Sequence, residues 1–134
     1  MPCCCETNLK AAYVLGIVLA GVSLVPALVA WFFPPAVVFG ILSALMHGVL
    51  VVGAYKRHTT VILVWMGLGC VSCIAIASSA VVLIVKVGLP EEFRGFLSVL
   101  VMSMIAVQVW TIKVAFDAKK EIEEDGKKVI LENQ

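Results

Sequence analysis

Charge is scarce in this sequence, and its distribution excludes several classes of protein. Only 14% of the 134 residues are charged and 62% are hydrophobic, whereas about a quarter of the residues of a soluble domain are charged. The net charge is +1, and no basic stripe interleaved with aromatic residues supports nucleic-acid binding. The composition is that of a membrane protein, with few residues left over for a soluble domain.

Patterns that carry catalysis or hold cofactors are also missing. The sequence has no nucleophile elbow, no phosphate-binding loop, no His/Cys set with metal-ligand spacing and no carboxylate deep in an apolar run. Cys70 and Cys73 have the spacing of a redox motif, but they lie inside a long apolar run, where a thiolate is disfavoured. We therefore expect a protein that is not an enzyme and that uses no metal, cofactor or soluble small-molecule substrate.

Long hydrophobic runs are what the sequence does contain. Four of them reach about 20 residues or more, which is long enough to cross a bilayer as a helix. They predict an all-α membrane protein built as a four-transmembrane-helix bundle. The expected segments are an N-terminus 1–10, spans 11–33 and 36–55, a turn 56–60, a span 61–85, a loop 86–95, a span 96–116 and a tail 117–134.

Local signals indicate how the first three spans are joined. Pro34-Pro35 leaves a two-residue connection, which forces the first two spans into a tight antiparallel hairpin. Thr59 or Thr60 is available to cap the third span. Trp65 is expected near the start of that span, at the membrane interface.

The fourth span has signals at both of its ends. Pro90, followed by two glutamates, is typical of the first position of a helix, so the fourth helix should begin within the preceding loop. Beyond the span we expect one or two further helical turns, which Gly126 would stop. The apolar triplet 129–131 could contact a partner or the membrane surface, or belong to a frayed terminus.

Basic residues flank the spans unequally, which predicts the orientation through the positive-inside rule. Only Lys86 and Arg94 fall on the side of the loop 86–95. Both termini are therefore expected to face the cytoplasm. The basic residues expected on that side are Lys10, Lys56, Arg57, Lys119, Lys120, Lys127 and Lys128.

Three adjacent cysteines, Cys3, Cys4 and Cys5, precede the first span. Cytoplasmic thiols beside a membrane entry point are candidates for S-palmitoylation, because an acyl chain can insert there without disturbing the fold. Plain reduced thiols are the alternative. A zinc site is disfavoured, because neighbouring side chains cannot readily surround one ion.

Rows of small residues at helical spacing predict where the spans pack closely. Gly40, Ala44 and Gly48 form such a row in the second span. Gly69, Cys73 and Ala77 form another in the third.

Each span also places one polar side chain at a similar depth. His47 shares the small-residue face of the second span, and Gln108 lies at a matching distance along the fourth. Ser23 and Ser72 reach this level from the opposite direction. This midplane polar layer has two interpretations: a proton- or ligand-handling site, or a neutral imidazole bonded to Gln108 or a serine that holds the helices in register.

The layout of the chain resembles a known group of membrane proteins. N-terminal cysteines, a minimal first turn, a second span ending GAYKRH and a third containing ILVWMGLG are similar to small uncharacterised tetraspan proteins of arthropods, themselves distantly similar to lysosome-associated (LAPTM-like) tetraspan proteins. The resemblance covers residue 3 to about 116 and implies a non-enzymatic, adapter-type role. The tail lacks the Pro-Tyr motifs of the lysosomal relatives, so it gives no basis for ubiquitin-ligase recruitment.

These observations favour an accessory subunit that binds a larger channel, transporter or pump and assists its assembly, trafficking or gating. One alternative is a self-assembling channel or transporter subunit that uses His47 and Gln108. Another is a membrane-organising protein of junctions or vesicles. The expected partners are the lipid bilayer and either a larger integral membrane protein or further copies of this chain. The expected location is the plasma membrane or an endolysosomal membrane.

Overall fold

The computed structural model describes residues 7–29, 31, 32 and 34–134, and within these ranges the regular structure is entirely helical. Each of its four helices is long and apolar enough to cross a membrane. The expected all-helical architecture with four membrane-length helices is confirmed. The helices are α1 (Thr7–Val29), α2 (Pro34–Tyr55), α3 (Thr59–Lys86) and α4 (Glu91–Glu132).

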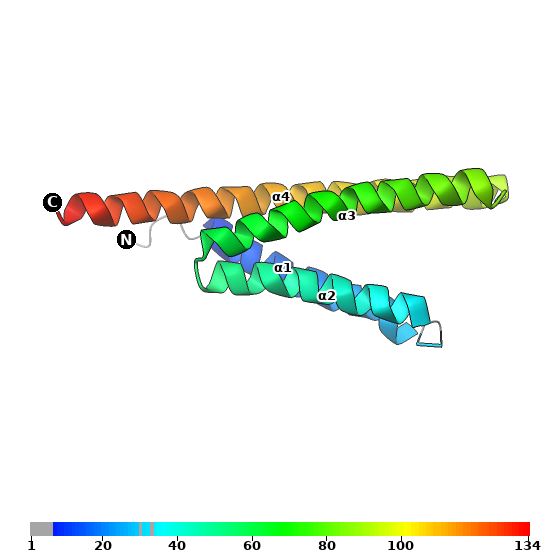
Figure 1. The fold of residues 1–134 in the computed structure, drawn as a ribbon, viewed down its shortest axis with the longest axis horizontal. Helices are drawn as coiled ribbons and strands as arrows, with labels where there is room; N and C mark the ends of the chain where they lie inside the picture. Colours follow the sequence, from blue (N-terminus) through cyan, green and yellow to red (C-terminus); the bar gives the residue numbers. More distant parts are fainter. Residues whose placement is uncertain (1–6, 30, 33) are drawn as a thin grey trace.

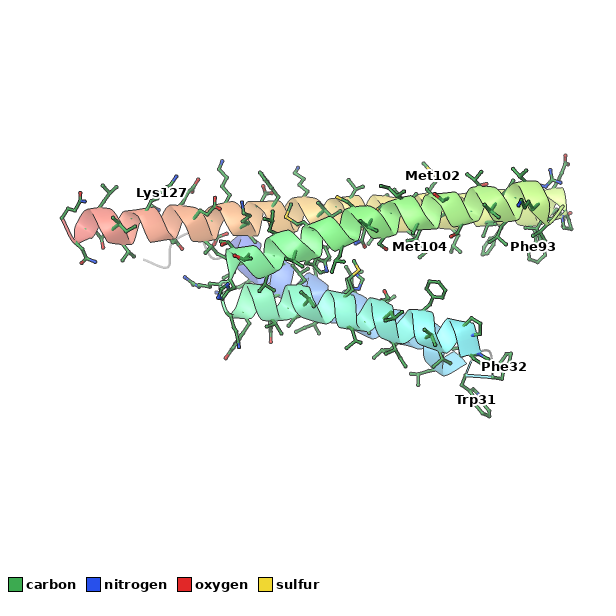
Figure 2. The ribbon with its side chains drawn as sticks, in the orientation of Figure 1. Trp31, Phe32, Phe93, Met102, Met104 and Lys127 are labelled. Carbon is green, nitrogen blue, oxygen red and sulfur yellow. The ribbon has the colours of Figure 1, made fainter. Side chains whose placement is uncertain are left out.

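The helices form two antiparallel hairpins, α1–α2 and α3–α4, which meet at one end and diverge toward the other (Figure 1). We call the end with the α2–α3 turn the closed end, and the end with the α1–α2 and α3–α4 connections the open end. Contacts between hairpins join α1 to α4 and α2 to α3. At the open end, Trp31 and Phe32 project from one hairpin and Phe93 from the other (Figure 2).

Alanine and a few larger side chains hold the closed end together. Ala12, Ala54 and Ala118 form one buried cluster, to which α1, α2 and α4 each contribute a residue. Small side chains let helix backbones approach closely and gain van der Waals contact. A second buried cluster adjoins it and consists of Leu50, Ile62, Trp65 and Ala115.

Trp65 does not face the lipid as an interfacial tryptophan is expected to do. Its side chain is 0% exposed and packs inside the bundle against α2 and α4. Ile62, Trp65 and Gly69 recur at helical spacing and are all buried, so they share the face of α3 that meets its neighbours. The helical period, rather than the nearness of Trp65 to the turn, decides which way the indole points.

Two predicted helix starts also need correction. No side chain caps α3, and His58 occupies the N-cap position, so Thr59 and Thr60 already lie inside the first turn. The tight turn before it is closed by a hydrogen bond from the His58 N–H to Gly53 O, and Arg57 adopts a positive φ of 52°. Pro90 is the N-cap residue of α4 rather than its first helical residue, although two glutamates do follow it in the first turn.

Gly126 does not stop α4, which continues without interruption to Glu132. A glycine inside a helix costs only about 1 kcal/mol relative to alanine, and the residues around it favour the helix. Lys119 pairs with Glu123 at 3.1 Å and Lys120 with Glu124 at 4.0 Å, both at the i,i+4 spacing that supports a helix. The expected tail is therefore an extension of the fourth helix.

This extension of α4 is tied to the other hairpin through Glu121. The residue is only 9% exposed. The backbone N–H groups of Asn8 and Leu9 favour its charged form, while its Oε2 atom is buried without a hydrogen-bond partner. These N–H groups lie in the first turn of α1, where a helix has no partners of its own for them. One turn further on, Asp125 lies 3.9 Å from Arg57 of the α2–α3 turn.

Burial and the neighbouring Asp125 raise the pKa of Glu121 above its ordinary value of 4.5, while the backbone N–H groups of Leu9 and Asn8, together with Arg57, partly oppose this. A carboxyl group whose pKa is higher in the folded than in the unfolded state destabilises the fold when it ionises. The free energy of unfolding therefore falls as pH rises from the unfolded-state pKa through the folded-state pKa. We therefore expect Glu121→Gln, which keeps an acceptor oxygen but cannot ionise, to become more stable relative to the native protein between about pH 4 and pH 7. Thermal unfolding in detergent across this range tests it, and a pH-independent difference between the two proteins contradicts it.

α1 and α2 pack closely at Gly16. A Cβ there would lie 2.7 Å from Val51 Cγ2 and 3.4 Å from the His47 carbonyl oxygen, whereas a Cβ at Gly21 would meet nothing within 4 Å. Gly16→Leu should therefore lower the free energy of unfolding by about 1–3 kcal/mol, the usual cost of overpacking. Gly21→Leu is the matched control on the same helix and should change it by less than about 0.5 kcal/mol. Equal effects in thermal unfolding would contradict this assignment.

Candidate functional site

All four helices line one apolar cleft of about 500 Å³ between the two hairpins. Along α2 it is lined from Phe39 to His47, whereas the buried core begins at Leu50. Along α4 it is lined from Leu100 to Gln108, and the buried residues of that helix begin at Thr111. The cleft therefore lies between the core and the open end.

Two stripes with identical spacing form the main walls. On both α2 and α4 the lining residues follow the pattern i, i+3, i+4, i+7, i+8, which is one face of a helix. From its first to its last residue, each stripe spans eight residue steps, or about 12 Å of helix. The stripes are Phe39, Leu42, Ser43, Met46 and His47 on α2, and Leu100, Ser103, Met104, Val107 and Gln108 on α4.

The structure brings the four residues of the expected polar layer to this cleft. Ser23, His47, Ser72 and Gln108 come from four different helices, and all line it. His47 and Gln108 each end the stripe of their helix on the side nearest the core. These two residues therefore form the floor of the cleft.

His47 is held by its own helix. Its side chain is 5% exposed, and Nδ1 lies 2.7 Å from the backbone oxygen of Ser43. A carbonyl oxygen only accepts, so Nδ1–H is the donor, and in the neutral ring Nε2 is then an acceptor. No hydrogen-bond partner reaches Nε2. The imidazole ring lies beside the indole of Trp65, with the ring centroids 6.2 Å apart.

Gln108 does not bond His47, so one of the expected register-holding hydrogen bonds is not formed. Its buried Nε2 has no partner either. The amide lies against Gly69 of α3, where a Cβ would come within 3.1 Å of Nε2 and 3.3 Å of Ile112 Cδ1. The small residue at Gly69 therefore makes room for the Gln108 amide and for α4.

A serine pair joins the first hairpin beside the cleft. The Ser23 hydroxyl donates to Leu19 O at 2.7 Å, so the 2.9 Å contact with Ser43 is one in which the Ser43 hydroxyl donates to Ser23 Oγ. The sequence-based polar layer included Ser23 but not Ser43, which was placed only at the edge of the helix face that carries His47. Ser43 precedes His47 by four residues, and that spacing alone would have placed it on the same face.

The other residues singled out in the sequence lie at varied positions. Gly40 and Gly69 are buried, while Ala44, Gly48, Cys73 and Ala77 are half-buried. A Cβ at Gly48 would meet nothing within 4 Å, so α2 makes no close helix contact there. Cys3, Cys4 and Cys5 lie outside the described residues. In the described part of the chain, no group of three or more His, Cys, Asp or Glu side chains is placed to hold a metal ion.

No protein-family model, curated protein or solved structure matches this chain. The resemblance to small tetraspan proteins therefore stays a prediction.

The serine pair can be tested with a double-mutant cycle. We expect Ser23→Ala and Ser43→Ala to be coupled by about 0.6 kcal/mol, the average for a hydrogen bond between membrane helices. The measurement is the free energy of unfolding in mixed micelles for the two single variants and the double variant. Ser103→Ala in place of Ser43→Ala is the matched control, because the Ser103 hydroxyl bonds the backbone of its own helix at Val99. Strict additivity for the Ser23–Ser43 pair would contradict the assignment.

Proposed function

We propose that this chain is a non-enzymatic accessory subunit that binds a larger channel, transporter or pump and assists its assembly, trafficking or gating. The observation that supports this is the part of α4 after Ala118, residues 119–132, which we call the α4 arm. The arm projects past the other three helices at the closed end (Figure 1). An accessory subunit needs such a surface outside its own packed helices.

The arm carries an apolar face beyond the point where the bundle can cover it. Ala115 and Ala118 are buried in the bundle, and Ile122 packs against the buried cluster to which Ala115 belongs. Val129 follows Ile122 by seven residues and so returns to the same face, but it is 56% exposed. Ile130 beside it is 62% exposed. An amphipathic helix that presents such residues typically docks into a groove of a partner.

The distribution of charge supports a cytoplasmic arm. The closed end carries Lys10, Lys56 and Arg57 together with the lysines of the arm, whereas the open end carries Lys86 and Arg94. By the positive-inside rule the closed end faces the cytoplasm. We propose this orientation in the plasma membrane or an endolysosomal membrane.

The two alternatives receive less support. A channel through this chain needs a polar path, yet between the cleft and the closed end lie buried Leu50, Trp65, Ala54 and Ala118. A membrane-organising protein sorted by acylation depends on the cysteines 3–5, which the structure does not describe. Both alternatives stay open to the experiment below.

We expect tagged protein, purified in mild detergent from its native tissue, to bring down one larger integral membrane protein in fixed ratio. Replacing Val129 and Ile130 together by Ser should reduce that recovery by about tenfold or more, because about 1.5–3 kcal/mol per buried side chain is lost. Replacing Lys127 and Lys128 by Gln is the matched control and should leave most of the recovery intact. Mass spectrometry and sizing give the readout. A homogeneous assembly of this chain alone would contradict the proposal and favour the channel.

A further inference from the structure

The floor of the cleft leaves two hydrogen-bonding atoms without partners. His47 Nε2 and Gln108 Nε2 are both buried and unpaired, and both residues line the cleft. Inside a membrane no bulk water is present to satisfy such atoms, so leaving them unpaired is costly. A ligand that reached the floor would gain by pairing with them.

The chemistry of the two atoms defines the ligand group. His47 Nε2 is an acceptor, because Nδ1–H is committed to the Ser43 carbonyl oxygen. Gln108 Nε2 is a donor. A hydroxyl group supplies one donor and an acceptor oxygen, so it has the chemistry to pair with either atom. A carboxylate offers no donor, an ammonium offers no acceptor, and either charge would be expensive at this depth.

The walls above the floor suit an apolar body of limited size. Phe39, Leu42, Leu100 and Met104 line them, and the cleft holds about 500 Å³ over about 12 Å of helix length. This is the range of a pocket for one compact small molecule. A lipid with two long acyl chains would leave most of its chains outside.

We propose that the cleft binds a membrane lipid of the sterol type, with its hydroxyl at the floor between His47 and Gln108 and its apolar body between the diverging hairpins. The lipid enters from the open end, where the two hairpins are apart (Figure 1). This site is separate from the α4 arm and does not depend on the proposed function.

The test uses the full chain in phosphatidylcholine vesicles with a photoreactive cholesterol analogue that keeps its hydroxyl. We expect saturable labelling of peptides from α2 and α4, and competition by unlabelled cholesterol. The corresponding ketone, cholestenone, can accept from Gln108 but cannot donate to His47. It should compete about tenfold more weakly, the effect of losing one hydrogen bond in an apolar site. Equal competition by the ketone, or labelling that does not saturate, would overturn the proposal.

A matched pair of variants locates the site. Met104 lines the cleft, whereas Met102, two residues earlier on α4, lies on the other side of the α3–α4 pair (Figure 2). Met104→Trp should fill the cleft and abolish saturable labelling, and Met102→Trp should leave it unchanged. His47→Leu should weaken labelling by about tenfold, provided that its helix content and elution volume match the native protein. Unchanged labelling in Met104→Trp, or equal losses in both methionine variants, would place the lipid elsewhere and overturn the proposal.

Discussion

The contact among Ala12, Ala54 and Ala118 is the constraint on which the rest of this structure depends. Three helices meet there because none of them presents a side chain beyond Cβ, and this fixes where the two hairpins touch. Toward the open end, the corresponding faces carry Phe39, Leu42 and Leu100 instead. Larger side chains keep helix axes further apart, so hairpins that touch at the closed end diverge beyond it, and the cleft follows from that divergence.

Part of this arrangement could be predicted from the sequence because it depends on local period and span length. The four apolar runs predicted four membrane-length helices, and the position of His47 among small residues predicted that it faces inward. Equal distances along two antiparallel hairpins also predicted that Ser23, Ser72 and Gln108 would reach the same level as His47. These inferences need only the 1.5 Å rise and 100° turn of a helix.

What could not be predicted depends on tertiary contacts. Nothing in the sequence shows that Glu121, in a charged tail, is buried against the first turn of a helix more than a hundred residues earlier. Gly126 has a strong local tendency to end a helix, yet α4 continues through it to Glu132. Trp65 lies near a turn and resembles an interfacial residue, but its neighbours Ile62 and Gly69 show that the face is buried. The angle between the hairpins depends on the small side chains where the hairpins touch and on the larger side chains toward the open end, and these positions are distant in sequence.

The helix α4 carries both the cleft wall and the arm, and it does so without a break. The 21 residues from Gln108 to Val129 correspond to about 32 Å of helix, so the two surfaces do not overlap and an occupant of one leaves the other accessible. Between them, α4 contacts the α1–α2 hairpin through Ala115 in the cluster with Leu50, through Ala118 in the cluster with Ala12 and Ala54, and through Glu121 at the start of α1. At these contacts the α1–α2 hairpin holds α4. The buried alanine cluster and the buried carboxylate of Glu121 therefore lie between the apolar cleft and the exposed arm.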